Sequence, residues 1–290
     1  MPAETRTLNL PDVDLVYDVI EPDAPADPAK PTLLLAGHPM TGEGFLALAG
    51  HFTDRRVALY DPRGLGRSVR KDGSSDRSPA LHVADLHALI TEIGGPVDIL
   101  ASSGGAVNAL ALVEAHPDDV RVLVAHEPPL IAELPDAEAA FAAEQANFER
   151  YQQRGFGAGM AGFIGLVSWQ GEVTPAYFEQ PEPDPAALGL PVDDDGSRDD
   201  PLLSGTAKGV TAYRASAEKL ARASGKVFIG VGVETGEALP ARTARAAARA
   251  FDLPLVEFPS HHGGFGAEEG PYPGKATEFA VTLRRVLDQA

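Results

Sequence analysis

The sequence predicts an α/β protein with a mostly parallel central sheet, and three observations support this fold class. Short apolar runs alternate with segments of helical periodicity through the first 125 residues. The same alternation returns near the end of the chain, from residue 227 onward. Between these parts, from residue 128 to about 225, no clear strand alternation is visible. We therefore expect βαβ units in two pieces of chain, separated by an insertion of different character.

The expected strands are short runs rich in Val, Ile and Leu that end at turn-forming residues. The run 32–36 (TLLLA) stops at Gly37, and the run 57–60 (VALY) is closed by Asp-Pro-Arg-Gly. Continuous apolar runs of this length are typical of strands buried on both faces. The remaining expected strands are 15–20, 97–100, 120–125, 227–231 and 255–258.

The expected helices carry apolar residues at helical spacing. In 79–93 these are Leu81, Leu86, Leu89 and Ile90, which fall on one face. The inserted part holds an Ala-rich helix at 136–154, a small apolar segment at 155–169 and a Pro- and Asp-rich loop at 180–201. Further helices are expected at 106–114, 209–223, 240–251 and 277–287.

Composition excludes several classes of function. The 290 residues include no Cys, which excludes a disulfide scaffold, thiolate metal sites and a cysteine nucleophile. The formal charge of −18 disfavours nucleic acid and anionic lipid as partners. The first residues carry no signal-peptide pattern, and no apolar run approaches the ~18–20 residues of a membrane span. We expect a cytoplasmic protein that binds neither nucleic acid nor membrane.

The segment 98–106 (DILASSGGA) carries the strongest chemical signal, because a buried strand runs through a serine directly into a helix. A nucleophile elbow has this context, and its sharp turn needs small residues two positions before and after the nucleophile. Ser103 has Ala101 and Gly105 at those positions, whereas Ser102 would have the bulky Leu100. The sequence therefore predicts Ser103 as the nucleophile.

A serine hydroxyl needs a base and an acid that orients the base. His261 and His262 directly follow the strand 255–258, in a loop of Pro and Gly. Glu234 is the first acid after the preceding strand and is the preferred orienting acid. Glu127, at the end of the strand 120–125, is the second candidate. The resulting order along the chain is Ser, acid, His.

Acyl transfer also needs N–H groups that hold the developing oxyanion. The N–H of Gly104, directly after the nucleophile, is one candidate. The other should come from the loop after the strand 32–36, where Pro39 has no N–H to give. His38 is therefore the first choice and Met40 the second. The histidines show no metal-binding spacing such as HExxH, and no GxGxxG follows the first strand, so we expect neither metal nor cofactor.

These motifs, taken in order, resemble the α/β-hydrolase superfamily, and most of all a group of poorly characterised actinobacterial members. The resemblance implies an eight-stranded, mostly parallel sheet with helices on both faces. It divides the chain into a core, 1–129 and 225–290, and a helical cap, 130–224. In the family pattern the catalytic histidine aligns with His262. The segments that carry the resemblance are 37–39, 61–68, 101–105, 126–129 and 258–265.

The resemblance implies a cofactor-free serine hydrolase that cleaves esters or lactones of a small organic substrate. Met40, Glu127, Phe163 and Trp169 are expected to line the substrate pocket. Related enzymes that open epoxides or cleave carbon–halogen bonds use Asp as the nucleophile, so a serine argues against them. The alternatives are an aminopeptidase of the proline iminopeptidase type, a carbon–carbon bond hydrolase, a perhydrolase, or a non-catalytic ligand-binding protein on the same fold. The protein is expected to be a monomer or a homodimer.

Overall fold

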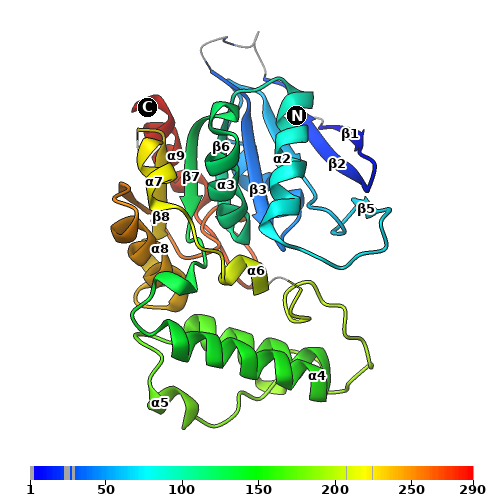
Figure 1. Ribbon diagram of the computed structural model, residues 1–290, viewed down its shortest axis with the longest axis vertical. Helices are drawn as coiled ribbons and strands as arrows, with labels where there is room; N and C mark the ends of the chain where they lie inside the picture. Colours follow the sequence, from blue (N-terminus) through cyan, green and yellow to red (C-terminus); the bar gives the residue numbers. More distant parts are fainter. Residues whose placement is uncertain (1–2, 23–26, 28–29, 207, 224, 290) are drawn as a thin grey trace.

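The computed structural model describes residues 3–22, 27, 30–206, 208–223 and 225–289. A central sheet runs through the molecule, and helices cover both of its faces (Figure 1). Its strands follow the order β1-β2-β4-β3-β6-β7-β8-β9, and the short β5 pairs with β2 at the side. The strands are β1 (Glu4–Asn9), β2 (Val13–Ile20), β3 (Leu33–His38), β4 (Val57–Tyr60), β5 (Val69–Arg70), β6 (Val97–Ser103), β7 (Val120–His126), β8 (Val227–Gly232) and β9 (Leu255–Phe258).

The mostly parallel sheet that the sequence predicts is confirmed. From β4 through β3, β6, β7 and β8 to β9 every neighbouring pair is parallel, while β2 pairs antiparallel with β1, β4 and β5. The eight strands of the main path match the expected number, with the two-residue β5 in addition. Because parallel strands share one direction, the carboxyl ends of β3, β6, β7, β8 and β9 lie along one edge of the sheet.

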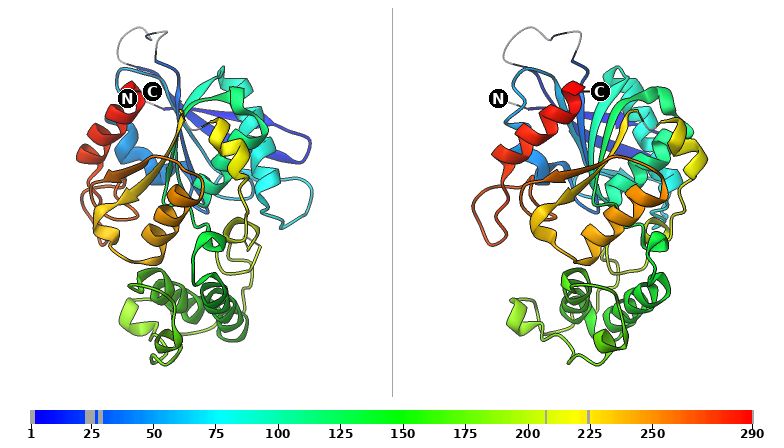
Figure 2. Two further views of the ribbon diagram at one scale, coloured as in Figure 1. Left: turned by 60° about the vertical axis from the view of Figure 1, so that its left-hand side comes forward. Right: turned by 90° about the vertical axis from the view of Figure 1, so that its left-hand side faces the viewer.

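Helices of two core layers sandwich the sheet. On one face α2, α3, α7 and α8 pack on residues such as Ile99 and Leu123, and on the other α1 and α9 pack on residues such as Leu35 and Val124. Figure 2 shows α9 on the opposite side of the sheet from the helices that follow β6 and β8. The helices are α1 (Leu46–Ala49), α2 (Pro79–Ile93), α3 (Gly104–Ala115), α4 (Ala137–Ser168), α5 (Pro175–Phe178), α6 (Lys208–Thr211), α7 (Ala217–Arg222), α8 (Leu239–Ala250) and α9 (Ala276–Gln289), with 3-10 turns at Gly42–Phe45, Pro117–Asp119, Ile131–Glu133, Ala186–Leu188 and Val233–Thr235.

The insertion between β7 and β8 lies beyond the carboxyl edge of the sheet (Figure 1). Its main element is α4, which breaks at Gly155 with φ 80°, a backbone conformation that glycine adopts without strain. The break folds α4 into two helical arms, where the sequence predicts a helix followed by a small apolar segment. The Pro- and Asp-rich stretch 180–201 contains a single 3-10 turn in the described chain.

The end of the insertion returns to the core before β8 begins. Leu220 of α7 and the neighbouring Ala223 are buried in the same apolar layer as α2 and α3. Ser224, the proposed last residue of the cap, lies outside the described residues. We propose that the chain divides into a core and a cap, and that α7 packs on the core.

A buried ion pair holds the turn after β4. Arg63 is fully buried, and its guanidinium donates to both carboxylate oxygens of Asp85 on α2, at 2.6 and 2.5 Å. A third bond reaches Asp12 at 2.9 Å. This bidentate geometry satisfies the charge of Arg63 inside the core and ties the turn to α2.

The helices described here include none that is both long and apolar enough to cross a membrane.

Candidate active site

Ser103 occupies the turn between β6 and α3. Its backbone has φ 58° and ψ −131°, a strained conformation for a residue other than glycine. The two following glycines are required by close packing. A Cβ on Gly104 would lie 2.8 Å from the carbonyl oxygen of His38, and one on Gly105 would lie 2.7 Å from that of Ala36. The turn thus holds Ser103 at the N-terminus of α3, at the carboxyl edge of the sheet.

His262 and Glu127 form a hydrogen-bonded pair at the same edge. Nδ1 of His262 lies 2.6 Å from Oε2 of Glu127, which directly follows β7. The other oxygen of Glu127 accepts the N–H of Gly232 at 2.9 Å. Glu127 is fully buried and adopts a positive φ of 46°, which turns its side chain toward the loop after β9.

The electrostatics of this pair fix the position of the proton on the imidazole. Burial alone would raise the pKa of Glu127, but the hydrogen bond from His262, the neighbouring His126 and the Gly232 N–H bring this pKa down to about 2. Glu127 is therefore ionised at neutral pH and can only accept hydrogen bonds. Nδ1 of His262 must carry the proton, which leaves the lone pair on Nε2.

Ser103 and His262 line one cavity of about 630 Å³ beneath the inserted helices. In the described chain no hydrogen bond joins the hydroxyl of Ser103 to His262. Such bonds are often long until a substrate binds, and they tighten in the reacting complex. The wall of the cavity is mainly apolar, with contributions from the core and from α4; its apolar residues include Pro39, Pro129, Ile131, Phe148, Phe163, Leu166 and Leu239.

Glu234 does not contact His262, contrary to the preference from sequence. It pairs with Lys275 at 2.5 Å, and both side chains are nearly half exposed. The structure corrects the expected pairing, because β7 ends beside the loop that carries His262, whereas Glu234, which also lines the cavity, bonds to Lys275. The signal for Glu127 was present in the sequence, since it is an acid that directly ends a buried strand.

The two neighbouring histidines after β9 point in different directions. Nε2 of His261 lies 3.1 Å from the carbonyl oxygen of Pro273, and its ring packs on Tyr272 at a centroid distance of 3.8 Å. His262 instead bonds to Glu127. Of the two candidates for the base, the geometry favours His262.

The candidate oxyanion donors lie on adjacent strands. His38 ends β3 and pairs in register with Ser103 of β6, while Gly104 begins α3. The His38 ring is buried against His82 at a centroid distance of 4.5 Å. Burial and the nearby charge of Arg77 lower the pKa of His38 to about 4, so its ring is neutral at neutral pH.

The expected pocket residues divide into two groups. Glu127 and Phe163 line the cavity. Met40 instead packs on the core layer under α1, and Trp169 packs against Tyr177 and donates its indole N–H to the carbonyl of Glu172. Neither Met40 nor Trp169 is among the described residues that line the cavity.

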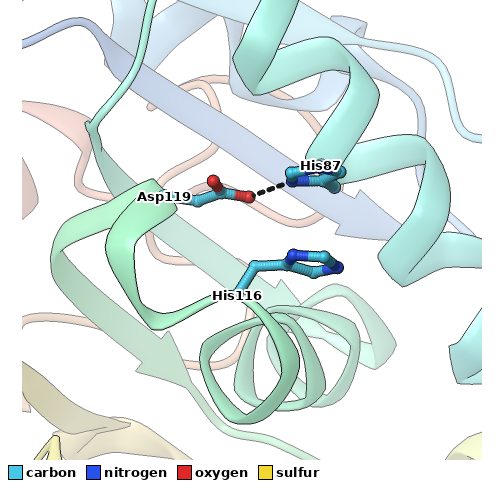
Figure 3. A group of neighbouring side chains, drawn as sticks. All are labelled: His87, His116 and Asp119. Carbon is cyan, nitrogen blue, oxygen red and sulfur yellow. Dashed lines mark hydrogen bonds and ion pairs between the residues drawn. The ribbon is translucent and has the colours of Figure 1, made fainter.

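Two clusters of described residues carry possible metal ligands. His126, Glu127 and His262 form one, but both oxygens of Glu127 already accept hydrogen bonds. His87, His116 and Asp119 form the other (Figure 3), and none of the three lines the cavity. His87 bonds to Asp119 at 2.7 Å and stacks on His116 with an interplanar angle of 12°. Since parallel stacked rings direct their lone pairs side by side, one ring would have to tilt before both could bind one ion.

Comparison with known proteins identifies the family. The model of the alpha/beta hydrolase family matches residues 32–273. The uncharacterized hydrolase YraK of Bacillus subtilis is 30% identical over 133 residues, which cover 45% of this chain and 47% of that protein. This chain thus aligns with about half the length of that curated relative.

Solved structures share the fold at low sequence identity. Proline iminopeptidase from Mycobacterium smegmatis is 19% identical with a TM-score of 0.64, and the match covers 99% of this chain and 98% of that one. A thermophilic esterase from Thermogutta terrifontis is 20% identical with a TM-score of 0.60, covering 100% and 99%. The Cif epoxide hydrolase from Acinetobacter nosocomialis is 15% identical with a TM-score of 0.62, covering 98% and 89%. With its elbow, its sheet and the family match over most of its length, the chain belongs to the α/β-hydrolase family.

Proposed function

We propose that this hydrolase cleaves a carboxylic ester or lactone through an acyl-enzyme on Ser103. One observation carries the proposal: the strained elbow with Ser103 and the His262–Glu127 pair face the same apolar cavity. A serine at the elbow supports attack on a carbonyl carbon, and the apolar wall suits the hydrocarbon part of a small ester.

The reaction follows from the proton positions described above. Nε2 of His262 takes the proton of the Ser103 hydroxyl as the oxygen attacks the carbonyl carbon. The N–H groups of Gly104 and His38 hold the oxyanion, and Glu127 stabilises the positive charge on the imidazolium. The tetrahedral intermediate collapses, and the alcohol leaves with the proton from His262. Water, deprotonated by the same Nε2, then attacks the acyl carbonyl and releases the acid and Ser103.

The first test is labelling with a fluorophosphonate probe, followed by hydrolysis of short acyl esters and lactones. Ser103→Ala should abolish labelling and turnover while the protein stays folded, as circular dichroism would show. Ser102→Ala is the matched control, because Ser102 is buried and its hydroxyl lies 3.4 Å from Nδ1 of His126. Equal labelling of wild type and Ser103→Ala would refute the proposed nucleophile.

A substrate panel distinguishes the proposed hydrolysis of esters or lactones from the alternative functions. Aminoacyl arylamides test an aminopeptidase, and styrene oxide tests opening of an epoxide. Faster turnover of either than of every ester and lactone would overturn the proposal. A ligand-binding protein would bind the esters without turnover in the wild type.

A further inference from the structure

One carboxylate that the inserted region adds to the cavity wall has no part in the proposed reaction. Glu144 lies on the first arm of α4, is half-buried and lines the same cavity as Ser103. Its Oε2 accepts a hydrogen bond from the hydroxyl of Thr211 at 3.1 Å. In the described chain Oε1 of Glu144 has neither a hydrogen bond nor an ion pair. Glu144 therefore offers one free acceptor oxygen to the cavity.

The short helix α6 connects this carboxylate to the nucleophile elbow. Thr211, which bonds to Glu144, is the last residue of α6, and the preceding residue Val210 reaches the elbow. A Cβ built on Gly104 would lie 3.3 Å from Cγ1 of Val210. The carboxylate and the elbow thus both lie next to α6 and line the same cavity, so a substrate in this cavity would extend from one to the other.

Other polar side chains from the inserted region are already engaged. Lys208 donates to Oε1 of Gln145 at 2.6 Å and lies over the Phe148 ring at 4.1 Å. Gln170 bonds to backbone groups of Glu237 and Ser168. Nδ2 of Asn147 has no partner and Asn147 also lines the cavity, but an amide nitrogen donates and cannot accept a hydrogen bond. Among the described side chains that the inserted region adds to this wall, Glu144 is therefore the one best placed to accept a bond from a bound molecule.

The charges around Glu144 indicate what kind of donor fits. Burial raises the pKa of Glu144, while the Thr211 bond and the charge of Lys208 oppose this shift. A cationic donor would have to lose its hydration and approach Lys208, which carries a like charge. A hydroxyl would make at Oε1 the same bond that Thr211 makes at Oε2, and it would bring no charge into the cavity.

We propose that Glu144 determines specificity by accepting a hydrogen bond from a hydroxyl group on the apolar part of the substrate. This inference rests on the proposed ester or lactone hydrolysis and narrows its substrate class to hydroxylated esters. The bond forms outside the reacting atoms, so it selects among substrates and takes no part in proton transfer.

The test compares pairs of p-nitrophenyl esters that differ only at the end of the acyl chain. One member of each pair ends in a methyl group and the other in a hydroxymethyl group. The acyl chains run from hexanoyl to decanoyl, because shorter hydroxylated esters close to five- or six-membered lactones without enzyme. The measured quantity is the ratio of kcat/KM for the hydroxylated member to that of the alkyl member. At the best chain length, Glu144→Leu should lower this ratio about tenfold, the order of magnitude expected for the loss of one hydrogen bond.

Two further variants distinguish this role from simple damage to the cap. Glu144→Gln keeps a neutral acceptor and should retain most of the preference. Glu149→Leu removes the same charge from the exposed side of α4 and should leave the ratio unchanged. An unchanged ratio in Glu144→Leu, or no hydroxyl preference at any length in the wild type, would overturn the proposal. So would a stronger preference for an ammonium-ended acyl chain.

A binding measurement keeps this inference separate from the proposed reaction. If the wild type hydrolyses neither member of any pair, the proposed function fails. The ethyl esters of the same acids are then titrated by calorimetry into Ser103→Ala and into Ser103→Ala/Glu144→Leu. Tighter binding of the hydroxylated ester that disappears in the double variant supports the role of Glu144, and equal binding of both esters refutes it.

Discussion

Nδ1 of His262 lies 2.6 Å from Oε2 of Glu127, although the two residues are 135 positions apart in the chain. The pair joins the end of β7 to the loop after β9, across the intervening end of β8. The N–H of Gly232, at the end of β8, holds the second oxygen of the carboxylate. Three neighbouring strand ends therefore fix the orientation of the imidazole.

The first prediction compares the two candidate acids. Glu127→Gln removes the charge that stabilises the imidazolium and the proton on Nδ1, so kcat should fall about 10³–10⁴-fold. Glu234→Gln should change kcat less than about threefold, because Glu234 pairs with Lys275 in an exposed ion pair. Steady-state hydrolysis of one ester by both variants makes the comparison. A larger loss of kcat in Glu234→Gln than in Glu127→Gln would instead identify Glu234 as the orienting acid.

The second prediction concerns acid stability. The pKa of Glu127 is about 2 in the folded protein, below its ordinary value of 4.5. The ionised form thus stabilises the fold above about pH 4.5, and this stability is lost as pH falls toward 2. The difference in free energy of unfolding between wild type and Glu127→Gln should shrink over that range. Urea titrations at several pH values measure it, and a difference independent of pH would contradict the prediction.

The third prediction concerns the packing behind the elbow. A Cβ on Gly105 would lie 2.7 Å from the carbonyl oxygen of Ala36 and 2.9 Å from the backbone of Gly37. Gly105→Ala should lower the free energy of unfolding by about 1–3 kcal/mol. It should also reduce kcat, because Gly37 precedes the oxyanion residue His38. Gly50→Ala is the control, since its Cβ would lie 3.5 Å from its nearest neighbour, in ordinary contact. Equal stability of the two variants would refute the steric argument.

The fourth prediction concerns the buried ion pair between Arg63 and Asp85. Arg63→Leu leaves Asp85 buried without its cation and should cost about 3–5 kcal/mol of unfolding free energy. The double variant Arg63→Leu/Asp85→Leu should recover a large part of this loss, because no unpaired charge remains buried and Asp12, the other partner of Arg63, is partly exposed to solvent. Thermal and urea unfolding of both variants test this, and a double variant no more stable than Arg63→Leu would contradict it.

Local constraints made much of the fold predictable from sequence. The strands β3, β4 and β6 are mainly apolar because they are buried on both faces, and the small residues around Ser103 reflect a turn that accepts nothing larger. Such patterns are imposed by neighbours in the chain or by burial, so one sequence displays them. The parallel order of the sheet followed from the alternation of strands and helices.

The acid that orients His262 could not be predicted from the sequence in the same way. β7 and β8 are neighbours in a parallel sheet, so both end at the edge where His262 lies. Glu127 and Glu234 therefore satisfy the same rule of chain order. The choice depends on the direction of each side chain, set for Glu127 by its positive φ and for Glu234 by Lys275. Contacts across 41 and 135 positions of the chain decide it, and no local pattern encodes them.

The position of Glu127 also has a consequence for protein engineering, because it allows the inserted helices to be replaced. All three residues proposed for catalysis lie outside the stretch from Ala137 to Pro201, which the chain enters after Glu127 and leaves before α6 and α7, the two helices that pack on the elbow and the core. Foreign helices could be spliced in as a cassette between these two points without moving Ser103, Glu127 or His262. A library of such replaced helices would then vary the substrates that the protein accepts, while the three catalytic residues stay the same.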